Sequence, residues 1–453
     1  MNIIIRENVR LLESKRLSRK AKHMNILFLS ISEFSHMSNH GIYQDLLHEF
    51  QRHGHSVFVI CSLGNKKGAQ AYLSDENNCK IVRVKIGNNA TTNLIQKGLT
   101  AVNLPKQYTA AIKQYFSDVT FDLILYPTPP ITLVDTVKYI KRRDHAKTYL
   151  LLKDIFPQNA VDLGMMRKSG LKSIIYRYFR NQEKKLYAVS DWIGCMSQAN
   201  VDYVLKHNPE VDPKRVEVCP NSIEVYDKSV DDKTRNEIRT KYGIPLDKKI
   251  FIYGGNLGKP QGIPFLMECL EKCKYVQEAY FFVVGNGTEF GLLEMYARKA
   301  NQANFIFAQR LPKEDYDTLV AACDVGMIFL DHRFTIPNFP SRLLGYMQAK
   351  LPVLAVTDPN TDIGNVIVDG GFGWWCESND AEKFYEIVKG IINSDLSHKR
   401  DNAYSYLLDH YTVEICYNKI MDRANNSKST IKGHYHEHSC YRRSGIYRFP
   451  HVD

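Results

Sequence analysis

The feature that most constrains the fold of this chain is an alternation that begins at Met24, in which short apolar runs are followed by longer segments of helical periodicity. The apolar runs are rich in β-branched and aromatic residues, as strands are. Between them apolar residues recur at helical spacing, as Leu46, Leu47 and Phe50 do within the helix expected over 42–53. Strands alternating with helices are typical of βαβ units, which build parallel sheets covered by helices. We therefore expect an α/β fold.

The alternation occurs twice along 453 residues, a length that exceeds what one ordinary hydrophobic core supports. Two Rossmann-like domains in tandem are the simplest interpretation. Strands are expected near 25–31, 56–61, 80–86, 121–126, 148–153 and 192–196, and then near 249–254, 279–284, 305–308, 325–330 and 352–356. The expected division is a dispensable basic extension at 1–23, a first domain at 24–215, a linker at 216–240, a second domain at 241–396, a closing helix at 397–423 and a disordered tail at 424–453.

The formal net charge is +11, and much of it lies at the two ends of the chain. Residues 1–23 hold seven Lys and Arg against two acids, and residues 424–453 hold five against two. The body between them is nearly balanced and its basic residues form no recognisable module with aromatic ones, so we expect no nucleic-acid partner. No apolar stretch approaches the ~20 residues that a membrane span requires. Ten scattered cysteines are typical of a reduced, cytoplasmic protein.

Turns between a strand and a helix are the expected ligand-binding positions, because parallel sheets bind ligands beyond the carboxyl ends of their strands. The turns that stand out are 38–41, 154–158, 254–258, 285–287 and 338–342. Gly258, Gly285 and Gly287 would let the backbone approach a diphosphate, although glycine at a tight turn needs no ligand. Neither glycine-rich turn completes the pattern of a dinucleotide site or a P-loop, so neither a dehydrogenase nor an NTPase is supported.

Two arginines of the second half are candidates to bind an anion. Arg342 falls in the first turn of an expected helix, where the helix dipole disfavours a cation. A phosphate that neutralises Arg342 would explain this position, and so would an ion pair with a neighbouring carboxylate. Arg310 follows the strand expected at 305–308 and is a second cation at a strand end.

Short motifs recur across residues 24–423. In the first half they are Gly41, Gly54-His55-Ser56-Val57, Asp154-Ile155-Phe156-Pro157 with Gly164, and Pro220-Asn221. In the second half they are Gly255-Asn256-Leu257-Gly258 with Gln261-Gly262, Gly285-Asn286-Gly287, Arg310-Leu311-Pro312, Asp324-Val325-Gly326, and Pro340 to Met347 with Leu351-Pro352-Val353. Taken jointly, these motifs resemble the family 4 glycosyltransferases of the GT-B fold, nearest to an O-antigen and capsular polysaccharide subgroup that includes N-acetylfucosamine transferases.

The resemblance implies an N-terminal acceptor-binding domain, a C-terminal domain that binds a nucleotide-diphosphate sugar, and a last helix that crosses back to the first domain. It implies transfer of a sugar, such as an N-acetylated deoxyhexosamine, to a lipid-linked saccharide acceptor in surface polysaccharide biosynthesis. Such enzymes typically retain the anomeric configuration and use neither a metal nor a cofactor. The donor-binding residues that it implies are Gly41, Asn256, Gly258, Gly285, Gly287, Arg310, Ser341 and Arg342.

Asp154 is the expected catalytic residue, because it ends the strand at 149–152 and would face the cleft. Its carboxylate could accept the proton of the acceptor hydroxyl or orient the sugar ring. Capping of the following helix is the alternative.

The chain departs from the family pattern at its best-known positions. Many members carry two glutamates eight positions apart, where this chain has Pro337 and Gly345, and an Arg and a Lys where it has Asn256 and Gln261. These changes leave two alternatives open beside an active transferase. One is a non-catalytic scaffold protein that keeps the fold, and the other is a sugar-nucleotide epimerase.

The segment from Leu171 to Tyr187 combines apolar residues such as Ile174 and Tyr178 with basic ones such as Lys172 and Arg177. That combination suits a helix that lies on an anionic membrane surface. A surface helix with its apolar face on the domain core is the alternative. We therefore expect a cytoplasmic protein with a peripheral contact to the inner face of the plasma membrane.

Overall fold

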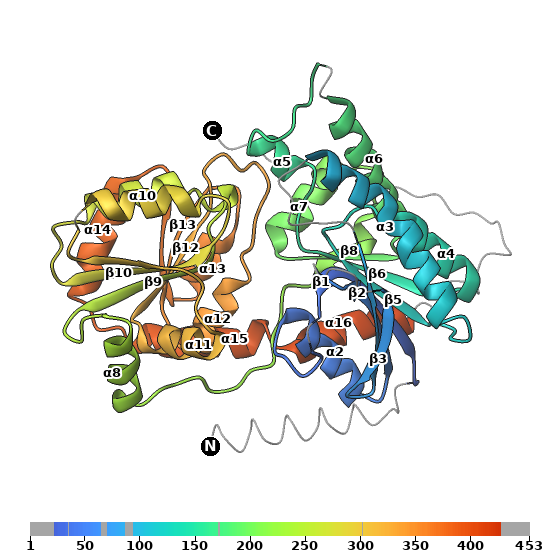
Figure 1. Cartoon of the computed structure of the whole chain (residues 1–453), viewed down its shortest axis with the longest axis horizontal. Helices are drawn as coiled ribbons and strands as arrows, with labels where there is room; N and C mark the ends of the chain where they lie inside the picture. The colour runs from blue at the N-terminus through green and yellow to red at the C-terminus, as the bar shows by residue number, and fades with distance from the viewer. Residues whose placement is uncertain are drawn as a thin grey trace, which may run out of the picture.

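The computed structural model of the protein describes residues 22–34, 36–64, 70–86, 94–170, 173–300 and 302–426. Within them the chain folds into two α/β domains that lie side by side, each built on one sheet with helices packed against it (Figure 1). This arrangement confirms the expected fold class. The expected basic extension, up to residue 21, and the expected tail, from residue 427, lie outside the described residues.

The first domain holds a sheet of eight described strands in the order β3-β4-β2-β1-β5-β6-β7-β8. Neighbouring strands run parallel except β3, which is antiparallel to β4. The strands are β1 (Asn25–Glu33), β2 (Ser56–Ser62), β3 (Tyr72–Glu76), β4 (Cys79–Val84), β5 (Leu123–Pro127), β6 (Lys147–Leu152), β7 (Trp192–Cys195) and β8 (Val216–Val218). The sheet therefore contains the six strands expected from the apolar runs, together with β3 and β8.

The second domain holds a fully parallel sheet of six described strands in the order β11-β10-β9-β12-β13-β14. The strands are β9 (Lys249–Asn256), β10 (Ala279–Asn286), β11 (Phe305–Ala308), β12 (Val325–Phe329), β13 (Val353–Thr357) and β14 (Gly373–Glu377). Five of them match the expected ranges, and β14 was not expected. From β9 the chain adds β10 and β11 on one side, and it then crosses to the other side to add β12, β13 and β14. The carboxyl ends of β9 and β12 therefore form a switch point, where such sheets bind ligands.

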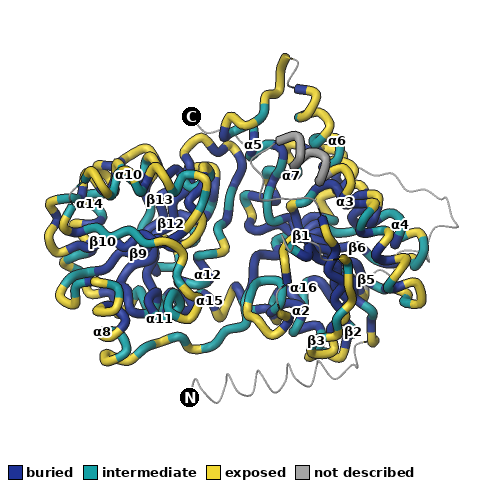
Figure 2. Tube along the Cα trace, viewed as in Figure 1, coloured by how far each residue is buried: buried dark blue, intermediate teal, exposed yellow. Residues whose placement is uncertain are grey.

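Helices cover the sheets and enclose a buried core in each domain (Figure 2). The first domain has α2 (Ile42–Arg52), α3 (Leu94–Tyr115), α4 (Val134–Asp144), α5 (Gln158–Asp162), α6 (Ser173–Val189) and α7 (Gln198–His207). The second has α8 (Asp232–Lys241), α9 (Ile263–Lys272), α10 (Phe290–Ala300), α11 (Lys313–Ala322), α12 (Arg342–Gln348), α13 (Ile363–Asp369), α14 (Ala381–Ile392) and α15 (Ser397–His410). The last described helix, α16 (Val413–Asn426), belongs spatially to the first domain. Two 3-10 turns, at Pro213–Arg215 and Lys259–Gln261, complete the elements.

The segment 216–240 is not a linker throughout. Its first residues form β8, which pairs with β7 in the first sheet, and Cys219 is fully buried. Its last residues belong to α8, whose Arg239 is 2% exposed in the second domain. Only the residues between β8 and α8 cross between the domains. A three-residue strand followed by charged residues carries too little apolar pattern to be distinguished from a linker.

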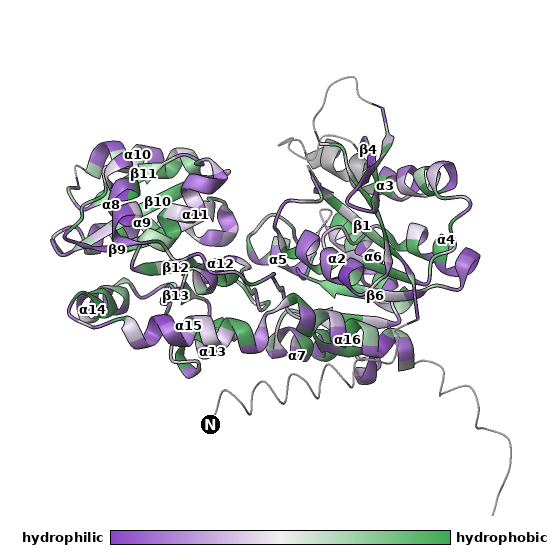
Figure 3. Cartoon of the chain, turned by 90° about the horizontal axis from the view of Figure 1, so that it is seen from below, coloured by the Kyte–Doolittle hydropathy of each residue, from purple (hydrophilic) through white to green (hydrophobic). Residues whose placement is uncertain are grey.

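The closing helix expected at 397–423 is in fact two helices. α15 lies against the second domain and α16 against the first, and Figure 3 shows the two along the lower edge of the molecule. Between these helices lie Tyr411 and Thr412. Thr412 forms a parallel β-bridge with Ile223, which belongs to the segment between β8 and α8 that leads from the first domain to the second. Tyr417 and Ile420 of α16 are buried in the first domain. The return of the chain to the first domain is therefore confirmed.

A third connection between the domains is the loop that follows β12. Its Phe334 and Ile336 are buried within the core cluster of the first domain. The backbone N–H and hydroxyl of Thr335 donate to the Asp162 carboxylate at 2.8 and 2.9 Å. The amide of Asn200 donates to the Pro337 carbonyl at 2.7 Å. The two domains are therefore joined on one side by the chain crossings and on the other by this loop.

One buried carboxylate, that of Asp324, connects several elements of the second domain. Asp324 accepts hydrogen bonds from Arg235 at 2.7 Å, Arg239 at 2.8 Å and Arg400 at 3.2 Å, which come from α8 and α15. It also accepts the backbone N–H of Ile250 at 2.9 Å, at the start of β9. Asp324 therefore ties two helices to the central strands.

We predict that Asp324→Ala lowers the free energy of unfolding by about 3–5 kcal/mol, because it leaves the buried guanidinium of Arg239 without its counterion. Urea denaturation measures the change. Glu237→Ala is the matched control, since Glu237 pairs at 3.9 Å with Lys233 on the exposed face of α8. Equal stability of the two variants would contradict the assignment.

Candidate functional site

A cavity of about 550 Å³ lies between the two domains, at the carboxyl end of β9. The first domain contributes Gly41 and Ile42 at the start of α2. The crossing segment contributes Ile223 and Lys228, and the second domain contributes the end of β9 and faces of α11 and α12. The cavity therefore occupies the switch point of the second sheet, with part of its wall supplied by the other domain.

Glycines at the end of β9 make room for side chains from two helices. A Cβ atom at Gly254 would lie 2.1 Å from the hydroxyl of Tyr316 on α11. Gly255 has φ of 131°, a backbone conformation that side chains disfavour, and a Cβ there would lie 3.2 Å from the Arg342 guanidinium. Both helices can therefore bring a polar side chain against the strand end.

Arg342, at the start of α12, is one of the residues that line this cavity. Its guanidinium carbon lies 4.3 Å from the ring centroid of Tyr253. Its Nη1 atom is buried and has no hydrogen-bond partner within the described part of the chain. Among the residues that the structure describes, no carboxylate forms an ion pair with it, so the ion pair considered from the sequence is not found. A half-buried guanidinium with one buried, unused donor atom is suited to an anionic ligand.

Four of the eight expected donor-binding residues line the cavity together: Gly41, Asn256, Ser341 and Arg342. The side chain of Asn256 donates to the Gln261 side chain at 2.8 Å, which in turn accepts the Gly258 backbone N–H at 3.2 Å. A neutral amide pair therefore stands where the family carries two cations.

The remaining glycines have a structural reason. A Cβ at Gly285 would lie 1.9 Å from the Gly255 carbonyl oxygen, and one at Gly287 would lie 2.3 Å from the Leu257 carbonyl oxygen. Both glycines let β10 and the turn after β9 pack closely. Neither of them lines the cavity, and Gly258 does not line it either.

Arg310 is exposed and does not line the cavity. It follows β11, whereas the Arg342 guanidinium lies against the end of β9, and β10 stands between these two strands. At a strand spacing of about 4.8 Å, the ends of β11 and β9 lie roughly 10 Å apart. The structure therefore does not bring Arg310 and Arg342 to the same point.

Asp154 follows β6 and lies outside the set of residues that line the cavity. Both of its carboxylate oxygens accept from the side-chain amide of Asn159, at 2.9 and 2.7 Å. It does not cap α5, whose N-cap residue is Pro157. Burial raises the pKa of Asp154 to about 6, although hydrogen bonds from the Ile155 backbone and from Asn159 favour the charged form. Such a carboxyl can hold or release a proton near neutral pH.

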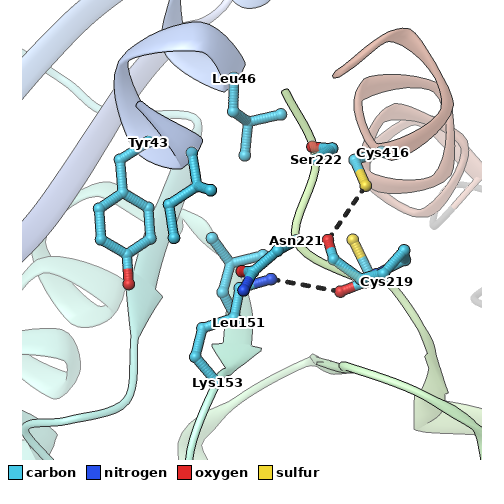
Figure 4. A pocket seen from close by; sticks show the side chains of 10 residues that line it. Tyr43, Leu46, Leu151, Lys153, Cys219, Asn221, Ser222 and Cys416 are labelled. Carbon is cyan, nitrogen blue, oxygen red and sulfur yellow. Dashed lines mark hydrogen bonds between the residues drawn. The ribbon is translucent and has the colours of Figure 1, made fainter. Parts of the chain in front are cut away.

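The neighbouring Lys153 was not singled out from the sequence. It lines a small cavity on the opposite face of the first sheet, with room for about one water molecule (Figure 4). Its ammonium donates to the Cys219 carbonyl at 3.3 Å, and the Cys416 thiol donates to the Pro220 carbonyl at 3.3 Å. Burial lowers the pKa of Lys153. These contacts fasten the crossing segment and α16 to β6, so Lys153 supports the domain junction.

Three side chains near the cavity could in principle hold a metal ion: His40, Asp45 and Glu224, whose ligand atoms lie within 4.8 Å of one another. Asp45 is already used, since it accepts the backbone N–H groups of Gly41 at 3.2 Å and Glu224 at 3.0 Å. Glu224 is ion-paired with Arg52. The cluster therefore joins the start of α2 to the crossing segment.

Three further lining residues were missed by sequence reasoning, namely Lys228, Tyr316 and Tyr346. Tyr316 and Tyr346 occupy core-facing positions of their helices, where an aromatic residue is ordinarily structural. Tyr346 donates to the Met327 carbonyl at 3.2 Å and can accept the Gly254 N–H at 3.3 Å, so it fixes the glycine turn. Tyr346 belongs to the motif at 340–347, and its membership of that motif was the one available sign in the sequence that it lies near the site.

Comparison with known proteins gives the following matches. Residues 234–406 match the family described as Glycosyl transferases group 1. The probable glycosyltransferase WbjE of Pseudomonas aeruginosa is 27% identical over 302 residues, which cover 66% of this chain and 73% of WbjE. The putative colanic acid biosynthesis glycosyl transferase WcaI of Escherichia coli (strain K12) is 23% identical over 249 residues, covering 54% and 60%.

Among solved structures, HepE of Anabaena in complex with UDP and glucose superposes with a TM-score of 0.61 at 14% identity. The match covers 88% of this chain and 99% of HepE, so it includes both domains. At this identity the likeness concerns the fold.

We predict that Asp154 titrates with a pKa near 6 and that Asn159→Ala raises this pKa further, because the amide stabilises the charged carboxylate. Carboxyl ¹³C NMR of aspartate-labelled protein measures both values, and Asp154→Asn identifies the resonance. A value near 4 in the unaltered protein would show that burial does not act on this group as described.

Proposed function

We propose that this chain, a glycosyltransferase of the GT-B fold whose second domain belongs to the Glycosyl transferases group 1, transfers a sugar from a nucleotide-diphosphate donor to a lipid-linked saccharide in surface polysaccharide biosynthesis. The second domain binds the donor and the first domain binds the acceptor. The reaction proceeds with retention of the anomeric configuration and without a metal ion. The transferred sugar is of the N-acetylated deoxyhexosamine class.

The observation that carries the proposal is the half-buried guanidinium of Arg342, which lines the cavity and whose Nη1 atom is buried without a partner among the described residues. A buried donor atom without a hydrogen-bond partner is unfavourable, and an anion from the sugar donor removes that penalty. The fork of a guanidinium matches two oxygens of a phosphate. The cavity volume of about 550 Å³ falls within the range of small-molecule sites.

A solved structure of similar fold supports a nucleotide donor. HepE is described as a complex with UDP and glucose, and it has the same two-domain fold. In this chain the cavity lies beyond the carboxyl end of β9, next to the glycine turn, where parallel sheets bind phosphates. We therefore assign the donor diphosphate to the cavity between Gly255 and Arg342.

In this proposal the Arg342 guanidinium also contributes to catalysis. As the glycosidic bond breaks, negative charge grows on the departing nucleoside diphosphate, and a fixed cation stabilises this charge more strongly than it stabilises the ground state. Because Asn256 and Gln261 are neutral and pair with each other, Arg342 carries more of this task than one arginine would beside two further cations. Asp154 is the proposed acceptor-side carboxylate, which takes the hydroxyl proton or orients the ring.

The acceptor is proposed to reach the enzyme at a membrane surface. The first half of α6 exposes Ile174 and Ile175, at 66% and 57% of their surface, next to the exposed Arg177. Its second half packs Leu186 and Tyr187 into the core. Leu171 and Lys172, part of the same expectation, lie outside the described residues. Exposed isoleucines beside cations suit the interface of an anionic bilayer.

The described residues contain no helix that combines the length and the hydropathy needed to cross a bilayer. From the exposed residues of α6 we propose a cytoplasmic enzyme that contacts the inner face of the plasma membrane through the first half of this helix.

We predict that Arg342→Ala lowers kcat/KM by roughly 10²–10³, the effect of removing one preorganised charge-stabilising donor. Arg342→Lys should restore activity only in part, since an ammonium cannot make the two-point contact. Transfer is measured as release of nucleoside diphosphate that depends on an isolated lipid-linked acceptor. Accumulation of an isomerised donor sugar, without such release, would instead identify an epimerase.

Calorimetric titration of UDP, GDP and dTDP into the folded variants separates binding from folding. The affinity should fall in Arg342→Ala and change little in Arg310→Ala, which removes an exposed cation from a more distant strand end. Unchanged affinity in Arg342→Ala would refute the diphosphate assignment. If the unaltered protein binds none of the three nucleotides and transfers no sugar, the transferase proposal is wrong and the chain is a non-catalytic scaffold protein.

We predict that replacing Ile174 and Ile175 by Asp abolishes sedimentation with anionic phosphatidylglycerol vesicles and that Arg177→Ser weakens it. Both changes remove groups that are exposed on α6. Leu408→Asp is the matched control, since Leu408 is a 45% exposed apolar residue of the other domain. Vesicle binding that survives the double replacement would rule out this surface.

A further inference from the structure

A second, smaller pocket lies in the first domain between α5, α6 and α7. Its volume is about 100 Å³, roughly a third of the lower limit for a drug-sized ligand site. Gln158 of α5 lines it and also lies 3.3 Å from Thr335, on the loop that reaches across from the second domain. The pocket therefore opens near the junction of the two domains and has room for part of one small ring.

Aromatic rings and fixed polar groups make up much of its wall. Tyr176, Tyr203 and His207 line it, and the rings of Tyr203 and His207 are stacked with centroids 3.9 Å apart. Arg180 is held in place by Glu183 at 2.6 Å and by the Asn208 side chain at 2.7 Å. Flat apolar faces next to immobilised hydrogen-bonding groups match a pyranose, which has an apolar C–H face and a rim of hydroxyl groups.

The pocket adjoins the catalytic carboxylate of the proposed function. Ile155, which lines the pocket, directly follows Asp154. Glu183, which also lines it, acts electrostatically on Asp154. Asp154 does not itself line the pocket but lies next to two residues of its wall, to Ile155 in the chain and to Glu183 through its charge. The Arg342 cavity is the separate place for the donor.

The exposed apolar turn of α6 lies one helix face away from the pocket. Ile174 and Ile175 point outward, whereas Tyr176 of the same turn lines the pocket. The ammonium of Lys168 lies 5.9 Å from the ring centroid of Tyr176. A saccharide carried on a lipid could therefore enter the pocket while its lipid remains at the surface of α6.

We propose that this pocket between α5, α6 and α7 is the acceptor subsite, in which Tyr176 packs against the acceptor sugar ring and the Arg180–Glu183 pair bonds its hydroxyl groups. The proposal rests on the proposed transferase function, because it assigns that function's acceptor to a place. It names the ligand class as a neutral pyranoside.

Saturation-transfer-difference NMR tests the proposal with the full chain and the methyl glycosides of glucose, galactose, fucose and N-acetylglucosamine, each with UDP present. At least one glycoside should receive saturation from the unaltered protein. Tyr176→Leu, which keeps apolar volume and removes the flat ring, should reduce that signal at least fivefold, and Tyr176→Phe should retain it. Tyr275→Leu is the matched control, since Tyr275 is 84% exposed on the second domain.

Absence of signal from all four glycosides, or an equal signal in Tyr176→Leu, would overturn the inference. Calorimetry with UDP, GDP and dTDP on the same samples keeps the two proposals apart. Nucleotide binding without glycoside binding would remove the acceptor subsite and leave the transferase proposal intact. Glycoside binding without nucleotide binding in the unaltered protein would contradict the transferase proposal instead.

Discussion

The chemistry of this molecule depends on Arg342, a half-buried cation that has no carboxylate partner among the described residues. Gly255 leaves room for the Arg342 guanidinium and Gly254 leaves room for Tyr316, and Tyr346 fixes the turn that carries both glycines. Tyr253 supplies a ring face in place of an anion. The Arg342 guanidinium can therefore pair with an anion in the cavity between the domains, and in the proposed function this anion is a phosphate of the donor.

The sequence predicted the architecture well because the apolar runs of buried parallel strands are strong signals. Its failures have physical causes. β8 has three residues and β14 lies at a sheet edge, so neither carries a long apolar run. The break between α15 and α16 falls at Tyr411, which is buried and interrupts no apolar periodicity. Periodicity reports burial, and burial continues across the point where the chain changes domain.

The site was predictable where one residue type has one plausible use. Arg342 was identified because a cation opposes the helix dipole at its position. Gly285 and Gly287 were ambiguous, and the closeness of β9 to β10 explains them without a ligand. The grouping of Tyr253, Tyr316 and Tyr346 around the guanidinium depends on three separate elements meeting, which no local pattern encodes. Likewise, the role of Asn159 beside Asp154 becomes visible only from the hydrogen bonds.

The crossing of the chain makes the first domain discontinuous in sequence. Its core includes Tyr417, Ile420 and Met421 of α16, about two hundred residues after the end of β8. During synthesis from the N-terminus, the strands of this domain emerge long before the helix that covers one of its faces. Until α16 leaves the ribosome, α2 packs on that face without the residues that α16 adds to the same core. The first domain to be made is therefore among the last to be completed.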